Sequence, residues 1–162
     1  MIDNPTIVRF AEPADADGIV SMIAELHDEN GLFPLSRRRV EQFLRRYYDK
    51  QGAIIGVIGD VGAPVASIYL AFDQPYYSDA FFLNESWNFV RPEHRRSDYA
   101  KQLIAFAKHC SDQMKVPLMV GIVSNHRTEA KIRLYERSLE KAGAYFVHNR
   151  HFLGETAWDK DR

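Results

Sequence analysis

The sequence has little cysteine and little net charge. Cys110 is its one cysteine among 162 residues, so no disulfide can form within the chain, and a reducing compartment is favoured. The formal net charge is -1, which argues against a dedicated nucleic-acid-binding protein. No apolar run is long enough to cross a bilayer, and residues 1–10 lack the pattern of a signal peptide. We therefore expect a cytoplasmic protein that binds neither nucleic acid nor membrane.

Metal-ligand and nucleotide motifs are also missing. The chain has six histidines, but their spacing matches no familiar metal site, and His148 and His151 would lie on opposite faces of a strand. Neither a Walker phosphate loop nor a dinucleotide fingerprint occurs. Cys110 lies on the apolar face of its expected helix, where a thiol is usually unreactive. We expect no bound metal.

What the sequence does contain is an ordinary globular balance of 46% hydrophobic and 27% charged residues, in a length that suits one domain spanning residues 1–162. Apolar periodicity predicts the order β-α-α-β-β-β-α-β-α-β. This order is typical of a mixed, mostly antiparallel α/β sheet flanked by helices. The expected strands are residues 6–10, 53–59, 65–72, 80–90, 116–124 and one or two within 144–152. Residues 116–124, apolar on both faces, are expected at the centre of the sheet, and residues 128–142 are expected to form a helix capped by Gly143.

The most informative segment runs from Val90 to Leu103, where a strand ends, the chain turns and a helix begins. A helix N-terminus carries unpaired N–H groups and partial positive charge, so it attracts phosphate oxygens. Arg95 and Arg96 would add two cations to these donors. The segment therefore predicts a site for a phosphorylated cofactor.

This segment, in this order of elements, resembles the acetyl-CoA signature of the GNAT superfamily of N-acetyltransferases. That signature has Gln or Arg, two variable residues, Gly, one variable residue, then Gly or Ala. The resemblance implies acetyl-CoA as acyl donor, held by the matching residues Arg95-Arg96-Ser97-Asp98-Tyr99-Ala100. Asp98 replaces the central glycine, whose backbone would approach the pyrophosphate. The resemblance then implies weaker cofactor binding, with the Asp98 carboxylate turned aside to cap the helix.

A second element of the resemblance lies near the end of the chain. In the family an asparagine at the position of Asn125 contacts the cofactor arm, and a tyrosine at the position of Tyr135 protonates the leaving thiolate. The spacing from Asn125 to Tyr135 is longer than usual here, and so is that from Tyr135 to Gly143, the latter by about one helical turn. Tyr135 is alternatively an aromatic residue at the edge of the core.

Acetyl transfer to an amine requires a proton acceptor, because an amine with a pKa near 10 is mostly protonated at neutral pH. Glu85 is the preferred candidate, since it interrupts the apolar row of its strand and desolvation would raise its pKa. A bulge in the strand would instead aim Asn84 or Ser86 at the cleft, and Glu85 could simply pair with an arginine. The resemblance places the donor to the carbonyl oxygen at the backbone of Phe89 or Val90.

The acceptor site is expected between residues 28–36, residues 73–79 and the last hairpin. Aromatic side chains in these segments and in the fourth strand suit many amines through apolar and cation–π contact. They are Phe33, Tyr76, Tyr77, Trp87 and Tyr145.

We therefore expect an enzyme that moves an acetyl group from acetyl-CoA to a primary amine of a small molecule or peptide, by direct attack in a ternary complex. A covalent acetyl-cysteine intermediate is not expected. One alternative is an acyl-CoA-binding module of the same fold that lacks activity. Another is a polyanion-binding protein that uses the arginines between Arg37 and Arg46. The resemblance also admits a homodimer.

Overall fold

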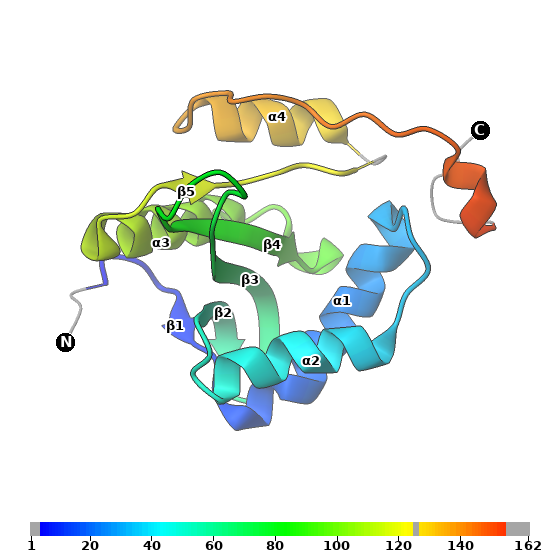
Figure 1. Cartoon of the computed structure of the whole chain (residues 1–162). Coiled ribbons are helices and arrows are strands. Elements are labelled where there is room, and N and C mark those ends of the chain that lie inside the picture. Colours follow the sequence, from blue (N-terminus) through cyan, green and yellow to red (C-terminus); the bar gives the residue numbers. More distant parts are fainter. Residues whose placement is uncertain (1–3, 125–126, 155–162) are drawn as a thin grey trace. The chain divides into compact units, whose positions relative to one another are not determined.

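The computed structural model describes residues 4–124 and 127–154. These residues form two compact units (Figure 1). The first unit comprises Met1–Met22 and Arg37–Gly121, and the second comprises Ile23–Ser36 and Ile122–Arg162. The expectation of one domain over residues 1–162 stays a prediction.

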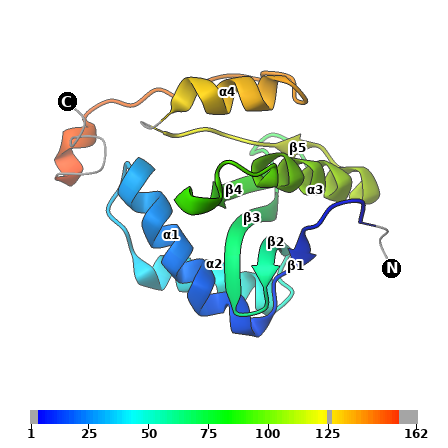
Figure 2. The same ribbon diagram turned by 180° about the vertical axis from the view of Figure 1, so that it is seen from behind.

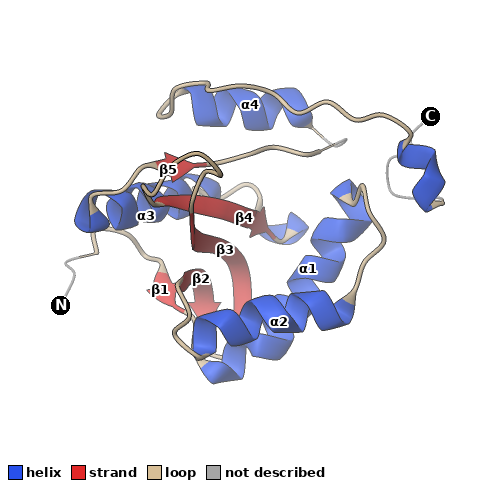
Figure 3. Ribbon diagram, viewed as in Figure 1, coloured by secondary structure: helices blue, strands red, loops and turns tan. Residues whose placement is uncertain are grey.

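The first unit contains a five-stranded sheet whose strands follow the chain order β1-β2-β3-β4-β5. The first four strands pair antiparallel, and β5 pairs with β4 in parallel (Figure 3). This arrangement confirms the expected mixed, mostly antiparallel sheet. The strands are β1 (Arg9–Phe10), β2 (Ala53–Asp60), β3 (Ala63–Asp73), β4 (Phe82–Val90) and β5 (Leu118–Met119).

The described residues contain seven helical segments, and helix α1 passes from the first unit into the second at Ile23. Gly31 ends α1, with its N–H donated to the His27 carbonyl at 2.8 Å. The α-helices are α1 (Ala16–Asn30), α2 (Arg37–Tyr48), α3 (Tyr99–Met114) and α4 (Thr128–Glu136), and the 3-10 helices are η1 (Pro13–Asp15), η2 (Pro92–His94) and η3 (Arg150–Leu153). Within the described residues, no helix is long and apolar enough to cross a membrane.

Helix α3 covers one face of the sheet (Figure 2), and its apolar side chains join the main core. Phe106 is central to this core and is 1% exposed. A side chain at Gly56 would come within 2.7 Å of the Phe106 ring, so only glycine lets the ring lie this close to β2. The core cluster consists of Val8, Ile54, Ile58, Ala66, Ile68, Leu70, Leu83, Val90, Leu103, Phe106, Ala107 and Cys110.

Helix α2 packs on the opposite face of the sheet. Phe43 lies 5.3 Å from the Tyr69 ring, and the Tyr69 hydroxyl donates to the Phe43 carbonyl at 3.2 Å. Arginines of α2 were considered for polyanion binding, and two of them have contacts within the protein. Arg37 pairs with Glu41 at 2.9 Å. Arg46 donates from Nη2 to the Phe72 carbonyl at 2.9 Å and from Nε to the Gln51 carbonyl, also at 2.9 Å. Two of the arginines considered for polyanion binding are therefore engaged in contacts within the protein.

A bulge divides β4 into two parts. Tyr69 of β3 lies opposite Trp87, but the next residue, Leu70, lies opposite Glu85, so Ser86 is an extra residue. A bulge shifts the alternation of side chains by one residue. Directly opposed residues share a face of the sheet, so Glu85 lies on the α3 face with Leu70, and Trp87 lies on the α2 face with Tyr69. The expectation that Glu85 and Trp87 belong to one row is therefore wrong, and the bulge that was considered as an alternative is present.

Three expectations for the last third of the chain are also wrong in the described residues. Residues 116–124 do not form a central strand, because β5 spans Leu118–Met119 at the edge of the described sheet. Helix α4 ends at Glu136 rather than near Gly143. Residues 144–152 contain no strand, and their one regular element is η3. Many apolar side chains here are exposed, including Phe146 at 95%, so the alternating apolar pattern had no packing partner to hold it as a strand.

Candidate functional site

The site predicted for the cofactor begins where β4 ends and α3 starts. Asp98 precedes the first turn of α3 with φ -89 and ψ 10, and its side chain does not cap the helix. The Asp98 carboxylate instead accepts from Gln102 Nε2 at 2.9 Å, one turn along the helix. The expectation that Asp98 caps α3 is therefore wrong. Because φ is negative, the backbone here does not need the conformational freedom of glycine.

The first turn of α3 presents several backbone N–H groups without an intramolecular acceptor. The N–H of Tyr99 donates to Ser97 Oγ at 3.2 Å, and the N–H of Gln102 donates to the Asp98 carbonyl at 3.0 Å. Within the part of the chain that the structure describes, the four N–H groups that take no such acceptor belong to Arg96, Asp98, Ala100 and Lys101. We call these four N–H groups the α3 amide cluster. Such a cluster at the start of a 16-residue helix fits the oxygens of a diphosphate.

The two arginines of the turn are placed differently. Arg95 Nε donates to the Val90 carbonyl at 3.1 Å, and its guanidinium carbon lies 5.3 Å from the centre of the Phe89 ring. Arg95 therefore fastens the turn to the end of β4. Arg96 is exposed. Ser97 Oγ donates to the His94 carbonyl at 2.5 Å, which closes the turn from its other side.

The β4 edge that faces away from β3 is open beyond the bulge. Within the described residues β5 pairs only with Leu83 and Asn84 of β4. The N–H of Arg91 donates to the Val65 carbonyl at 3.0 Å, so backbone groups of odd-numbered β4 residues after the bulge face β3. The N–H of Phe89 is therefore directed at β3, whereas the N–H of Val90 points to the open edge. Of the two expected donors, only Val90 has its N–H on that edge.

Glu85 lies where β4 and β5 diverge. Its carboxylate accepts a hydrogen bond from the backbone N–H of Gly121, just beyond β5. The side chain is half-buried, and desolvation raises the pKa of Glu85 to about 8, with the Gly121 hydrogen bond opposing this rise. A carboxyl group with such a pKa can take a proton near neutral pH and release it again.

Two further predicted residues, one for cofactor binding and one for catalysis, belong to the second unit. Asn125 lies outside the described residues. Tyr135 is half-buried on α4, and its carbonyl accepts from the N–H groups of Ser138 and Leu139 at 3.0 and 2.8 Å. The roles predicted for Asn125 and Tyr135 stay predictions.

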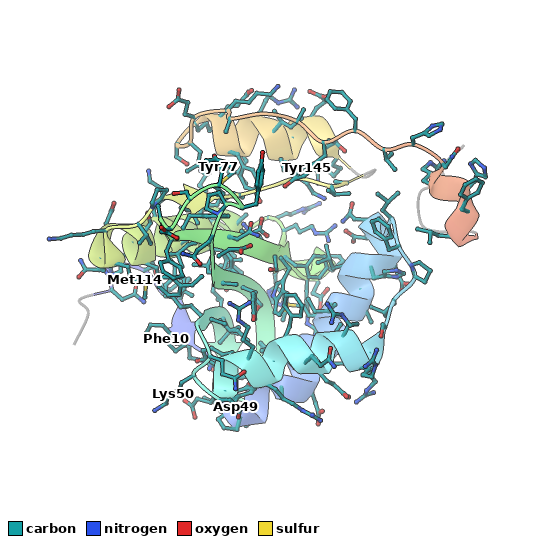
Figure 4. The ribbon with its side chains drawn as sticks, viewed as in Figure 1. Phe10, Asp49, Lys50, Tyr77, Met114 and Tyr145 are labelled. Atoms are coloured by element: carbon teal, nitrogen blue, oxygen red, sulfur yellow. The ribbon has the colours of Figure 1, made fainter. Side chains whose placement is uncertain are left out.

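The aromatic residues expected around the acceptor fall into two groups. Trp87 is buried against Tyr69, with Nε1 donating to Ser67 Oγ at 3.1 Å, so Trp87 is a packing residue of the sheet. Tyr76 and Tyr77, on the loop between β3 and β4, are 101% and 77% exposed. Their rings meet edge to face at 5.2 Å. The Tyr77 side chain on this loop is labelled in Figure 4. Phe33 and Tyr145, in the second unit, are exposed as well.

Sequence reasoning missed a polar cluster in the second unit, in which two side chains are buried and one is half-buried. Asn30, Ser124 and Lys131 contact one another there. The available signal was Ser124 at the end of an apolar segment, seven residues before a lysine on the expected helix. Spacing along the chain could not show that Asn30, far away in sequence, completes the cluster.

Metal-ligating groups and the single thiol are the other chemically reactive features of the described residues. No group of three or more His, Cys, Asp or Glu side chains could hold a metal ion there. Burial raises the pKa of Cys110 to about 11, so its thiol is protonated at neutral pH and is a poor nucleophile.

Comparison with known proteins adds the identity of the fold. No family model matches the chain, and no curated protein sequence matches it. Solved structures do match over most of the chain. A predicted acetyltransferase from Clostridium acetobutylicum, solved with acetyl-CoA, superimposes with a TM-score of 0.68, 14% identity, and coverage of 88% of this chain and 94% of that chain.

Two further structures carry more specific names. A ribosomal-protein-alanine N-acetyltransferase from Brucella melitensis has a TM-score of 0.65 and 16% identity, with 87% of this chain and 96% of that chain covered. AAC(6')-Iy, solved with the bisubstrate analog CoA-S-monomethyl-acetylneamine, has a TM-score of 0.66 and 14% identity, with 88% and 95% covered. The chain therefore has the GNAT acetyltransferase fold.

Proposed function

We propose that the protein is an N-acetyltransferase that moves an acetyl group from acetyl-CoA to a primary amine of a small molecule or peptide. The α3 amide cluster is the observation that carries this proposal, because four N–H groups without an intramolecular acceptor at the start of α3 suit a diphosphate. The neighbouring open edge of β4 and the raised pKa of Glu85 supply the rest of the chemistry.

In the proposed reaction the amine attacks the carbonyl carbon of the thioester directly, in a ternary complex. The new C–N bond forms as the C–S bond breaks, and Glu85 takes the proton that the amine releases. A carboxylate with a pKa of about 8 is a much better acceptor for this proton than an ordinary glutamate, because the amine has a pKa near 10. The N–H of Val90 stabilises negative charge on the carbonyl oxygen, and Tyr135 donates a proton to the leaving sulfur.

Several structures of the same fold support the proposed donor and acceptor. One is a complex with acetyl-CoA, and another is a complex with a bisubstrate analog of CoA. Asp98 favours a second candidate, an inactive acyl-CoA-binding module, because its carboxylate adds negative charge beside the amide cluster. We also propose that the protein acts in the cytoplasm, with small-molecule or peptide amines as partners and without nucleic acid or membrane. A homodimer is compatible with this proposal.

Calorimetry with CoA tests the amide cluster directly. Ala100→Pro removes one N–H donor from the first turn of α3, where proline is tolerated, and Ala100→Ser retains it. A hydrogen bond to a charged group contributes about 1.5–3 kcal/mol, so Ala100→Pro should weaken CoA binding by about tenfold or more. Ala100→Ser should bind like the wild type. Arg95→Ala should also weaken binding, because Arg95 fastens the turn.

Two outcomes would count against the proposal. If the wild type fails to bind CoA at high micromolar concentration, both candidate functions are wrong. If the wild type binds CoA but releases no thiol from acetyl-CoA with a broad panel of amines and peptide N-termini, the inactive binding module is the better description.

A further inference from the structure

The loop between β3 and β4, in the first unit, exposes two neighbouring tyrosine rings. Tyr76 and Tyr77 are 101% and 77% exposed, and their rings meet edge to face at 5.2 Å. We call these two residues the tyrosine pair. Large aromatic side chains that contribute nothing to the core of their own chain, on a surface loop, are typical of a contact surface for another molecule.

Hydrogen bonds fasten the tip of this loop. The N–H of Ser78 donates to the Pro75 carbonyl at 3.1 Å, which closes a turn around the tyrosine pair. Gln74 Nε2 donates to the Asp79 carbonyl at 2.9 Å. The N–H of Ala80 donates to Ser78 Oγ at 3.1 Å. A loop that is already ordered loses little conformational entropy when another molecule covers it, so more of the contact energy is available for binding.

The loop that carries the tyrosine pair is negatively charged. Residues 73–81 contain Asp73 and Asp79 and no lysine, arginine or histidine. Both aspartate side chains are exposed. In the described part of the chain, the Asp79 carboxylate has no hydrogen bond or ion pair. An aromatic face attracts a cation, and a carboxylate nearby adds to that attraction. The loop therefore matches a partner that carries guanidinium or ammonium groups.

The tyrosine pair is joined to the candidate base by a short piece of chain. β4 begins at Phe82 and reaches Glu85 as its fourth residue, and this part of the strand covers about 10 Å. The whole chain from Tyr77 to Glu85 can extend no further than about 28 Å. A ligand that contacts both places must bridge a distance of roughly this order, which a peptide of about four to eight extended residues provides. A compact small molecule is too short.

We propose that the tyrosine pair docks a basic peptide whose own amine is acetylated at Glu85. An arginine or lysine side chain of the acceptor lies against Tyr76 and Tyr77, beside the Asp79 carboxylate. This inference rests on the proposed function and narrows its acceptor from amines in general to cationic peptides. Because the docking contact is remote from the reacting amine, it is equally present in the ground state and the transition state. It therefore lowers KM and leaves kcat unchanged.

Thiol release from acetyl-CoA with two matched peptides tests the docking contact. Both peptides have about eight residues, so that they span the distance to Glu85, and each has a free N-terminus as its single amine. One carries two arginines in its C-terminal half, and the other has glutamines in their place. The wild type should prefer the arginine peptide by about tenfold in kcat/KM, through KM, because several exposed cation–π and ionic contacts add modestly to one another.

Four variants assign this preference to the loop. Tyr76→Ser combined with Tyr77→Ser should reduce it to about twofold, whereas Tyr76→Phe combined with Tyr77→Phe keeps both rings and should retain it. Asp79→Asn should weaken it at low salt and have less effect at high salt. Val61→Ser, at a 50% exposed apolar residue in the turn at the other end of β3, should leave it unchanged. Each variant should fold like the wild type, because exposed side chains contribute little to stability.

The outcomes distinguish this inference from the proposed function. An active wild type that turns over the two peptides equally, or turns over neither, would overturn the docking role and leave the acetyltransferase intact. If the double serine variant raises KM for spermidine but not for the arginine peptide, the loop holds a small polyamine. If it dissociates a dimer that the wild type forms in sedimentation, the loop contacts a second copy of the chain. Either result would overturn the proposal. A wild type that binds no CoA in calorimetry would refute the proposed function itself.

Discussion

Different kinds of buried contact stabilise the interior of each unit. In the first unit the buried side chains are largely apolar and include Phe106 at 1% and Leu70 at 0% exposed. In the second unit the two buried residues, within the described ranges, are Asn30 and Ser124. Apolar packing depends on volume and tolerates many sequences, whereas a polar cluster depends on individual hydrogen bonds. The buried contacts of the second unit therefore depend on individual polar side chains, whereas those of the first depend mainly on packing.

This difference also affects the candidate site. The α3 amide cluster and Glu85 lie on elements that contribute to the core of the first unit. Tyr135 lies on α4, which has no buried residue and is joined to the end of α1 by the contact of Lys131 with Asn30. We therefore expect substitutions in the second unit to disturb contacts with the arm and the leaving sulfur of CoA, while binding of the diphosphate at α3 is unchanged.

The largest expected effect comes from one substitution made in both units. Phe106→Ala should lower the free energy of unfolding by about 3–5 kcal/mol, because it leaves a cavity between α3 and the sheet. Phe146→Ala, at a site that is 95% exposed, should change it by less than about 0.5 kcal/mol. Chemical denaturation measures both. Equal losses would show that residue 146 is packed in solution and would remove the contrast between the units.

The next largest effect concerns catalysis by Glu85, which lies in the first unit. Glu85→Gln keeps the size of the side chain and removes the proposed base, so kcat/KM should fall by about a hundredfold or more. In the wild type, kcat/KM should decline as the pH falls through about 8, the pKa of Glu85, and this decline should vanish in the variant. Glu140→Gln, at an exposed position, serves as the control. A variant with wild-type activity would move the base to another group or to water.

The same variant has an effect on stability whose sign follows from the raised pKa. The folded state favours protonated Glu85, and this preference adds to the free energy of unfolding. The added stability is fully present below pH 4.5, the ordinary pKa of the group, and is lost as the pH rises through about 8. The wild type should therefore lose stability over this range relative to Glu85→Gln. Thermal unfolding at several pH values measures the difference, and parallel curves for the two proteins would contradict the raised pKa.

Local patterns predicted the elements that carry the site. The strands expected at residues 53–59 and 65–72 appear as β2 and β3, and the expected strand–turn–helix from Val90 onward appears as the end of β4 and the start of α3. The bulge at Ser86 was foreseen only as an alternative, because the alternation of one strand does not reveal its register with the next. This register decides which face Glu85 occupies.

The last third of the chain was predicted less well for a related reason. Residues 116–124 and 144–152 have patterns that suit strands, yet β5 spans two residues and the second segment has no strand. A strand requires a partner edge and a face to cover, and these depend on distant parts of the chain. The polar cluster of Asn30, Ser124 and Lys131 was missed for the same reason, because Asn30 lies far from the other two residues in sequence.

A moderate effect is expected at the ion pair between Arg9 and the buried Asp15 in the first unit. Asp15 is 0% exposed and binds Arg9 through two contacts, of 2.7 and 2.9 Å. Asp15→Asn should lower the free energy of unfolding by about 2 kcal/mol, because Arg9 loses its partner but remains partly in water. Breaking the exposed Arg37–Glu41 pair by Arg37→Gln should cost less than about 0.5 kcal/mol. Urea denaturation of both variants would measure the difference, and similar losses would contradict it.

Acid titration provides an independent check on Asp15. The Arg9 guanidinium lowers the pKa of Asp15 from 3.8 to about 2. The stability that the Arg9–Asp15 pair contributes is therefore present above pH 3.8 and is lost as the pH falls through about 2. Asp15→Asn should show a weaker fall in stability over this range than the wild type. An identical acid dependence in both proteins would assign the loss to other carboxylates.

The smallest effect should come from Asp98, which replaces the central glycine of the acetyl-CoA signature. Substitutions here test how this replacement affects CoA binding. The Asp98 carboxylate binds Gln102 rather than the amide cluster, so Asp98→Asn should keep this contact and remove a negative charge near the proposed diphosphate. We expect CoA to bind about threefold more tightly at low salt, with the gain lost at high salt. Asp98→Gly should improve binding no further, because φ at this position is -89 and glycine relieves no strain. Asp112→Asn, an exposed change further along α3, should leave binding unchanged. Tighter binding in Asp98→Gly than in Asp98→Asn would show that the diphosphate needs space at this backbone, and weaker binding in Asp98→Asn would give the carboxylate a direct part in holding the cofactor.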